Sequence, residues 1–151
     1  MRLALFQPDQ PQNTGTILRL GACMGAEVHI IEPCGFPFSV KALRRAAMDY
    51  VDHVTITRHV DFSAFEAWRA RDGGRLALLT TRASIAYTDT TFRDDDILLV
   101  GQESAGAPPE VHDAADMRLI IPMRPALRSL NVALSAAMVL GEAIRQTGPQ
   151  T

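Results

Sequence analysis

The chain has 151 residues, of which 47% are hydrophobic and 21% are charged, a composition typical of one globular domain with a substantial core. The net charge of −2 excludes a uniformly basic surface, so any contact with RNA has to rest on a local basic patch. The sequence has no apolar run long enough for a transmembrane helix, and the apolar segment after Met1 is too short for a signal peptide. We therefore expect a single cytoplasmic domain, residues 1–151, with no membrane association.

Short apolar segments alternate with helical patterns along the chain. In chain order we predict a strand at 3–6, a helix to 24, a strand at 28–31, a helix at 40–48, a strand at 54–56, a helix at 63–71, strands at 76–79 and 97–100, a helical turn after Pro108, a strand at 118–121 and a helix at 131–145. Segment 97–100 is continuously apolar, which indicates burial on both faces. The pattern predicts an α/β fold, a mostly parallel sheet with flanking helices.

The helix boundaries carry their own signals. Asn13 or Thr14 is the expected cap of the first helix, and Gly25 ends it. Ser63 has the capping-box spacing to Glu66 and is expected to open the third helix.

Several features argue against common classes of site. The cysteines, Cys23 and Cys34, lack metal-ligand spacing and are interpreted as reduced thiols in or near the core. Residues 85–96 look irregular, and the acidic run 94–96 at their end is interpreted as a solvated turn rather than a metal site, so no metal is expected. Neither a Gly-x-Gly-x-x-Gly nor a P-loop motif occurs, so ordinary dinucleotide and P-loop enzymes lack their fingerprints.

Three polar clusters follow predicted strands, where α/β proteins form ligand sites. They are residues 7–15, residues 101–106 and the loop 121–131. Each has a simpler reading. Asn13, Ser129 or Asn131 would serve as helix caps, and Glu103 would be either a cap acceptor or an acid–base group. Ser104 partly matches a nucleophile elbow, but Gln102 replaces the first glycine and the chain is too short for the usual α/β-hydrolase fold.

Taken together, the clusters resemble the motifs of the SPOUT superfamily of RNA methyltransferases, within it the TrmL-like branch that 2′-O-methylates the tRNA wobble nucleotide. The first motif is Pro11-x-Asn13-Thr14-Gly15-x-Ile17-x-Arg19, the second Gly101-x-Glu103-x-x-Gly106, and the third Ile121-Pro122-Met123 followed by Arg128-Ser129-Leu130-Asn131. Further matches are residues 29–36, residues 43–50 with Asp49-Tyr50, and residues 79–81. The matches keep their order over nearly the whole chain.

The resemblance implies a C-terminal trefoil knot and a cleft for S-adenosylmethionine, the methyl donor. The cofactor-binding positions it implies are Leu79, Thr80, Gly101, Glu103, Gly106, Ile121, Met123 and Ser129. It also implies a homodimer in which the first motif of one subunit faces the cofactor of the other. The last helix, apolar nearly all round, fits burial on several sides.

By resemblance, the reaction is attack of a ribose 2′-oxygen on the sulfonium methyl group, with Arg19 as the catalytic residue. A guanidinium keeps its proton at neutral pH, so we expect Arg19 to bind a neighbouring phosphate and stabilise negative charge on the 2′-oxygen. The residues expected to orient the reacting groups are Asn13, Glu103, Ser129 and Asn131.

The RNA partner is expected to be tRNA, a leucine tRNA in particular, bound by local cations. The candidates are Lys41, Arg44, Arg45, Arg58, Arg82, Arg124 and Arg128, although residues 41–45 equally fit a solvated helix face. Three alternatives stay open: 2′-O-methylation at another tRNA or rRNA position, a catalytically silent RNA-binding module, and a small nucleotide-dependent hydrolase or oxidoreductase.

Overall fold

A computed structural model describes residues 1–150, and for Val40 it describes the main chain only. Within that range the chain forms one seven-stranded parallel sheet. The strand order is β3-β2-β1-β6-β4-β7-β5. The strands are β1 Arg2–Phe6, β2 Glu27–Ile31, β3 Ile56–His59, β4 Leu76–Leu79, β5 Ile85–Ala86, β6 Ile97–Val100 and β7 Met117–Ile120. Because every pair is parallel, all strands end at the same edge of the sheet.

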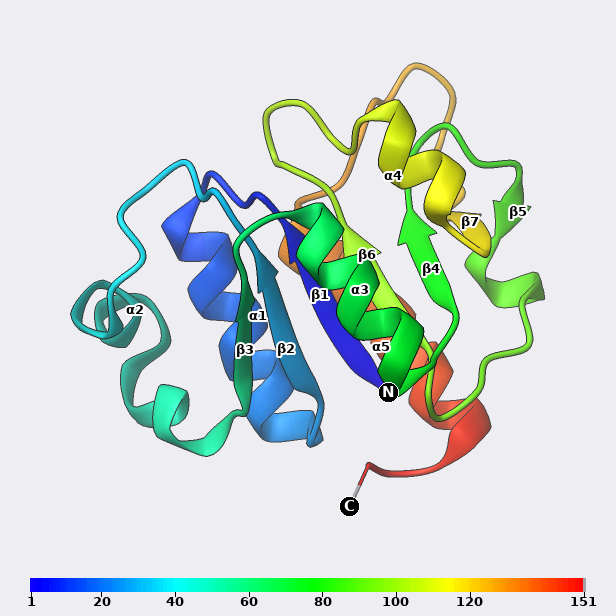
Figure 1. Cartoon of the computed structure of the whole chain (residues 1–151). Helices are drawn as coiled ribbons and strands as arrows, with labels where there is room; N and C mark the ends of the chain where they lie inside the picture. The colour runs from blue at the N-terminus through cyan, green and yellow to red at the C-terminus, as the bar shows by residue number, and fades with distance from the viewer. Residues whose placement is uncertain (151) are drawn as a thin grey trace.

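Helices cover both faces of this sheet (Figure 1). The α-helices are α1 Pro11–Met24, α2 Val40–Ala47, α3 Phe62–Asp72, α4 Pro109–Ala114 and α5 Val132–Thr147, and the 3₁₀-helices are η1 Met48–His53 and η2 Tyr87–Asp89. Helices α1 and α5 pack on one face, with α2 and η1 outside α1, whereas α3 and α4 pack on the other. The molecule thus has three layers, as the alternating sequence pattern predicted.

The central strands are apolar at every position because they serve both cores. In β6, Leu98 and Val100 join the core under α1 and α5, whereas Ile97 and Leu99 join the core under α3 and α4. All four side chains are buried, as predicted for this strand. Alternate residues of a strand face opposite sides, so a strand covered on both sides loses the usual apolar–polar alternation.

Two predicted helix caps are wrong. Helix α1 begins at Pro11, whose fixed φ suits the first helical position, and its N-cap residue is Gln10, so Asn13 lies inside the helix. Helix α3 begins at Phe62, and its cap is Asp61, whose carboxylate accepts a 2.7 Å hydrogen bond from the Ala64 amide. Gly25 ends α1 in the left-handed conformation, as predicted.

Several predicted boundaries also shift. Strand β3 begins two residues later than its predicted start at 54, and β7 begins one residue earlier, at Met117. The segment predicted to be irregular contains β5 and η2. Short edge segments carry too few side chains to fix a register by pattern, so pairing with a neighbouring strand decides their limits.

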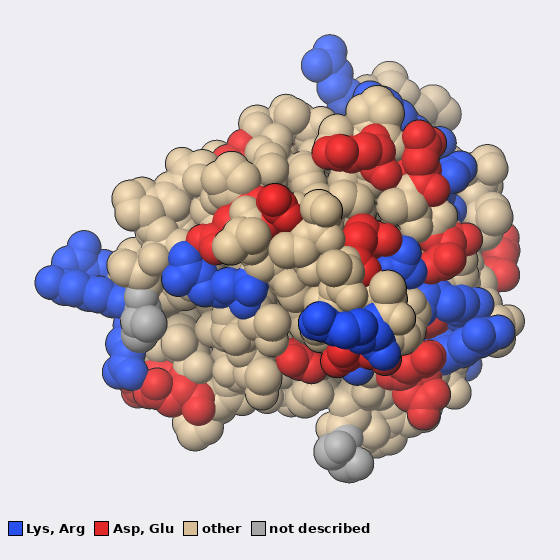
Figure 2. All heavy atoms as spheres, in the orientation of Figure 1, with Lys and Arg blue, Asp and Glu red and all other residues tan. Residues whose placement is uncertain are grey.

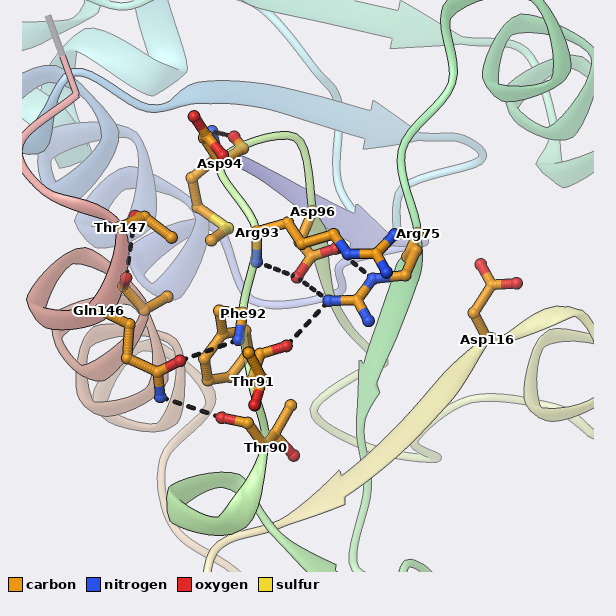
Figure 3. A network of polar contacts seen from close by, with 12 residues as sticks. Arg75, Thr90, Thr91, Phe92, Arg93, Asp94, Asp96, Asp116, Gln146 and Thr147 are labelled. Atoms are coloured by element: carbon orange, nitrogen blue, oxygen red, sulfur yellow. Dashed lines mark hydrogen bonds and ion pairs between the residues drawn. The ribbon is translucent and has the colours of Figure 1, made fainter.

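The acidic run holds a buried ion pair, which contradicts its interpretation as a solvated turn. Asp94 and Asp95 are exposed, but Asp96 is fully buried. Both of its carboxylate oxygens accept 2.8 Å hydrogen bonds from the Arg75 guanidinium, and one also accepts from the Arg93 amide (Figure 3). Asp96 and Arg75 therefore tie β6 to β4 at the amino ends of these strands.

The two cysteines lie in different environments. Cys23, on α1, is exposed, so the prediction of a core or near-core thiol is wrong there. Cys34 is partly buried, and burial together with the nearby Glu32 carboxylate raises the pKa of its thiol to about 11. Within residues 1–150, no three His, Cys, Asp or Glu side chains are grouped so that they could hold a metal ion. No helix in the described part of the chain is both long and apolar enough to cross a membrane.

Two histidines are buried side by side on β2 and β3, which the sequence did not predict. His29 Nδ1 lies 2.9 Å from His59 Nε2, and the Trp68 ring packs 4.2 Å from the His29 ring. Burial lowers the pKa of both imidazoles, that of His29 to about 4, where the positive charges of His59 and Arg2 add to the effect.

Candidate functional site

A cleft of about 680 Å³ lies at the carboxyl end of the sheet. Its walls come from the loops after β1, β6, β4 and β7, four adjacent strands, together with the first turns of α1 and α5. Convergence of these loops follows from the parallel pairing, which brings segments far apart in sequence to one edge. The three polar clusters singled out in the sequence all contribute to this cleft.

The loop after β6 is a tight turn that depends on two glycines. The amide of Gln102 donates a 3.0 Å hydrogen bond to the Gly106 carbonyl, and the Gly106 amide returns one of 2.8 Å to Gln102. Gly106 has a φ of +68°, and a Cβ on Gly101 would lie 2.5 Å from the Gly106 carbonyl carbon. Both positions therefore require glycine, one for its backbone conformation and one for close packing.

Glu103, in the same turn, is bound to the loop after β1. One of its carboxylate oxygens accepts a 3.0 Å hydrogen bond from the Asp9 amide. Burial and the neighbouring Asp9 carboxylate raise the pKa of Glu103, whereas hydrogen bonds from Glu103 and Ser104 lower the pKa of Asp9. The loops after β1 and β6 are therefore joined by two neighbouring carboxyl groups whose pKa values are shifted in opposite directions.

Ser104 takes part in this arrangement rather than acting as a nucleophile. Its hydroxyl donates to the Asp9 carboxylate and lies outside the set of residues that line the cleft. The weak resemblance to a nucleophile elbow therefore has a structural explanation: the serine closes the contact between the loops after β1 and β6.

Asn131 joins the other two walls of the cleft. Its side-chain oxygen caps α5 by accepting from the amides of Ala133 and Leu134, at 2.9 and 3.2 Å. Its side-chain nitrogen donates a 3.0 Å hydrogen bond to Asn13 on α1. Of the two caps considered for the last helix, Asn131 is the one present.

The sequence analysis missed His112, which lies on α4 and lines the cleft. Its Nδ1 lies 3.2 Å from the Pro108 carbonyl, so this nitrogen carries the hydrogen and Nε2 accepts from the Thr80 hydroxyl at 3.0 Å. The Thr80 hydroxyl also accepts from the Arg82 amide. His112 therefore fixes the loop after β4. His112 lies outside the three motifs, so no pattern in the sequence indicated this role.

The structure brings most of the predicted site residues together. All eight positions expected to bind the cofactor line the cleft: Leu79, Thr80, Gly101, Glu103, Gly106, Ile121, Met123 and Ser129. Asn13 and Asn131 line it as well. Arg19 does not line this cleft, because it lies farther along α1 with its guanidinium over the Tyr50 ring.

The expected RNA-binding cations are dispersed. Lys41, Arg44 and Arg45 are exposed on α2, and Figure 2 shows basic side chains at the edge of the molecule where α2 lies. Arg44 pairs with Asp52 at 2.8 Å. Arg58, on edge strand β3, pairs with Glu32 and stacks on Phe38. Arg124 and Arg128 are exposed in the β7–α5 loop, and Arg128 lines the cleft together with Arg82.

Comparison with known proteins shows which protein family has this architecture. The family model described as the SpoU rRNA methylase family matches residues 1–141. The chain belongs to the SpoU methylase family. This confirms the resemblance to SPOUT methyltransferases that the three motifs predicted, and it identifies an enzyme class, methyltransferases, rather than a hydrolase or oxidoreductase.

Two relatives match this chain over almost their whole length, and a third matches it over about half of its own. A protein of Beijerinckia indica named tRNA (cytidine(34)-2′-O)-methyltransferase is 64% identical over 146 residues, which cover 97% of this chain and 91% of the relative. A solved structure described as giving insights into 2-OH methylation of C/U34 on tRNA is 39% identical, with a TM-score of 0.90 and coverage of 96% of this chain and 94% of that one. An AdoMet-bound rRNA methyltransferase from Sinorhizobium meliloti is 29% identical, with a TM-score of 0.86. The match covers 95% of this chain and 55% of the S. meliloti chain.

Proposed function

We propose that the protein is a cytoplasmic tRNA (cytidine(34)-2′-O)-methyltransferase that uses S-adenosylmethionine to methylate the ribose of the wobble nucleotide. The observation that carries this proposal is the cleft, in which all three sequence motifs meet in a chain 64% identical to a relative of that name. The family description and the S. meliloti structure refer to rRNA. We favour tRNA because the relatives matched over nearly their full length are the tRNA enzymes.

The cleft suits S-adenosylmethionine in size and chemistry. Its volume falls within the range of about 300–1,000 Å³ usual for small-ligand sites. Strand ends and small residues, such as Gly101 and Ala105, form much of the wall, so main-chain groups are available to recognise a nucleoside. The bound donor would supply a methyl group made electrophilic by its sulfonium. The residues present therefore fit the cofactor that the resemblance implies.

The residues around the cleft would bind and aim the ribose. When O2′ forms a bond to the methyl carbon, the methyl–sulfur bond would break, the donor would leave as a neutral thioether, and the hydroxyl proton would pass to solvent water. Arg19 would stabilise the negative charge that develops on O2′ and bind an adjacent phosphate. Asn13, Glu103, Ser129 and Asn131 would orient the reacting groups. Glu103 is held in place for this role by the hydrogen bond that it accepts from the Asp9 amide.

The working unit in this proposal is a homodimer. Leu134 and Met138, four residues apart on α5, are exposed by 59% and 41%, and with Leu130, which lies just before the helix, they are large exposed apolar side chains. The opposite face of α5 is already buried in the core, so a second copy is needed to cover these side chains. In such a dimer Arg19 would reach the cleft of the partner subunit, which fits its absence from its own. Part of the proposal is also a C-terminal trefoil knot within a single domain, formed as the chain passes from β7 to α5.

The decisive assay is methyl transfer. The protein is incubated with labelled S-adenosylmethionine and total tRNA lacking wobble methylation, and the modified nucleotide is mapped. We expect label on the 2′-oxygen at position 34, first in leucine tRNA. Label at another tRNA position or only in rRNA would establish the alternative substrates. Absence of transfer would establish a silent RNA-binding module instead.

A subunit-mixing experiment tests the dimeric site. Arg19→Ala and Ser129→Ala variants, each expected to keep only a small residual activity alone, are denatured, mixed and refolded together. If Arg19 acts across the interface, one intact site forms in each mixed dimer and about a quarter of wild-type activity returns. A mixture that stays at the residual activity would place Arg19 and Ser129 in the same subunit's site. Leu134→Glu should shift the protein to a monomer in sedimentation experiments.

A further inference from the structure

Within residues 1–150, Arg2, Arg19 and Arg58 lie over aromatic rings, and of these three only Arg19 has no carboxylate partner. Arg44, Arg69 and Arg75 each lie 2.8 Å from a carboxylate oxygen. Within residues 1–150, no carboxylate forms an ion pair with Arg19, whose guanidinium carbon instead lies 4.4 Å from the centre of the Tyr50 ring. One terminal nitrogen is 3.5 Å from the Tyr50 hydroxyl. A carboxylate would neutralise the charge, whereas an aromatic face holds the guanidinium and leaves its positive charge available.

The contact joins Arg19 to a residue from a different part of the sequence. Tyr50 lies in η1, which follows α2. A Cβ added to Gly15 on α1 would lie 2.4 Å from the Ala46 Cβ, so the backbones of α1 and α2 touch one helical turn before Arg19. Ala47 and Val51 are both buried. They fix the two ends of the segment that carries Tyr50.

The chain turn between α2 and η1 is itself strained. Met48 has a φ of +55°, a conformation that costs a non-glycine residue energy, and its side chain is exposed, so packing of that side chain does not explain it. The turn redirects the chain at the point where it reverses toward α1, two residues before Tyr50. A strained backbone persists only where the surrounding structure holds it. The strain at Met48 therefore indicates that packing keeps η1, and with it Tyr50, in this position.

We propose that Tyr50 is a positioning residue for Arg19: it holds the guanidinium, uncompensated by an acid, in the orientation needed for the transition state. The inference rests on the proposed function, in which Arg19 stabilises charge on O2′. It assigns a role to the Asp49-Tyr50 part of the sequence, which does not line the cleft. A residue acting in this way affects the chemical step more than the binding of tRNA, and it leaves the binding of S-adenosylmethionine unchanged.

The test compares Tyr50→Leu, which removes the ring, with Tyr50→Phe, which keeps the ring and removes the hydroxyl. We expect Tyr50→Leu to lower kcat about tenfold, with a smaller rise in KM for tRNA and an unchanged Kd for S-adenosylmethionine, whereas Tyr50→Phe stays within about threefold of wild type. His53→Ala, an exposed change in the same 3₁₀-helix, serves as the control and should leave kcat and the melting temperature unchanged.

A double variant separates positioning from a general loss of structure. In an Arg19→Ala background, measured at single turnover with excess enzyme, Tyr50→Leu should cause no further loss, because its effect passes through Arg19. A further loss there, or a wild-type kcat for Tyr50→Leu alone, would overturn the inference while leaving the proposed function intact. Full activity of Arg19→Ala would instead overturn the role of Arg19 on which the inference rests.

Discussion

The Asn131 side chain donates a 3.0 Å hydrogen bond to Asn13, a residue 118 positions earlier in the chain. This contact joins the first turns of α5 and α1 at the mouth of the cleft. Helix N-termini carry partial positive charge and unpaired amides, so the pair places two favourable sites for an anion side by side. One asparagine thus serves both the stability of α5 and the shape of the site.

These two duties of Asn131 can be separated by substitution. Asn131→Ala removes both the cap and the contact with Asn13, and we expect a loss of about 1 kcal/mol in unfolding free energy together with a loss of activity. Asn131→Asp keeps an acceptor for the amides of Ala133 and Leu134 but cannot donate to Asn13. It should therefore retain the stability measured by denaturant titration and still lose activity. Equal stability loss in both variants would contradict the capping role.

Gly106→Ala should weaken cofactor binding beyond its effect on stability. Gly73 provides a matched control, because it also has a positive φ, has open space around its Cβ position and lies after α3, away from the cleft. Each alanine should cost about 1 kcal/mol or more of stability through backbone strain. Only Gly106→Ala should raise the Kd for S-adenosylmethionine in calorimetric titration. A similar change of Kd in both variants would point to global destabilisation.

Stability should fall in mildly acidic solution because of the buried histidines. The pKa of His29 is about 4 in the folded protein against an ordinary value of 6.5, so the unfolded chain binds a proton in this interval that the folded chain does not. The contribution is complete above pH 6.5 and is lost as the pH falls toward 4. We expect His29→Phe to flatten this part of the profile of unfolding free energy against pH. An unchanged slope would contradict this account of His29.

The buried pair of Arg75 and Asp96 should be far more important for stability than an exposed pair. Asp96→Ala leaves the Arg75 guanidinium and the Arg93 amide without their acceptor and should cost about 3 kcal/mol. Asp52→Ala removes the exposed pair with Arg44 and should cost about 0.5 kcal/mol. Thermal unfolding of both variants measures the difference, and comparable costs would contradict the burial argument.

Binding of tRNA should depend on salt through α2. Arg45 is exposed on this helix, and we expect Arg45→Ala to reduce the slope of log Kd against log salt concentration by about one. Arg71→Ala removes an exposed charge from α3, on the opposite layer of the protein, and should leave the slope unchanged. Equal slopes for both variants and wild type would assign residues 41–45 to a solvated helix face.

Residues in continuous elements were the most predictable from sequence. Segments 76–79 and 97–100 match β4 and β6 because a strand covered on both faces is apolar throughout and is bounded by polar or glycine residues. The cleft residues were also predictable, since the motifs follow strands whose carboxyl ends share one edge. These residues could therefore be assigned to the cleft without knowing the order of the strands in the sheet.

Features that depend on contacts between distant segments could not be predicted. Pro11 displaced Asn13 from the cap position, and Asp96 is buried only because Arg75, on a neighbouring strand, supplies its partner. His112 and Tyr50 act on residues 31 or 32 positions away, through the packing of separate elements. Periodicity reports which face of an element is buried, but it carries no information on which partner covers that face.

The position of β6 at the centre of the sheet has a consequence for synthesis on the ribosome. Strand β1 pairs with β6, so Leu3 must wait for Leu98 before its second edge is covered. During translation the chain therefore carries an exposed edge on the largely apolar strand β1 until about two thirds of the chain has emerged. Such edges promote association between nascent chains, and sheets built from distant segments fold slowly. We expect expression yield of this protein to depend on chaperone capacity more strongly than its ordinary composition suggests.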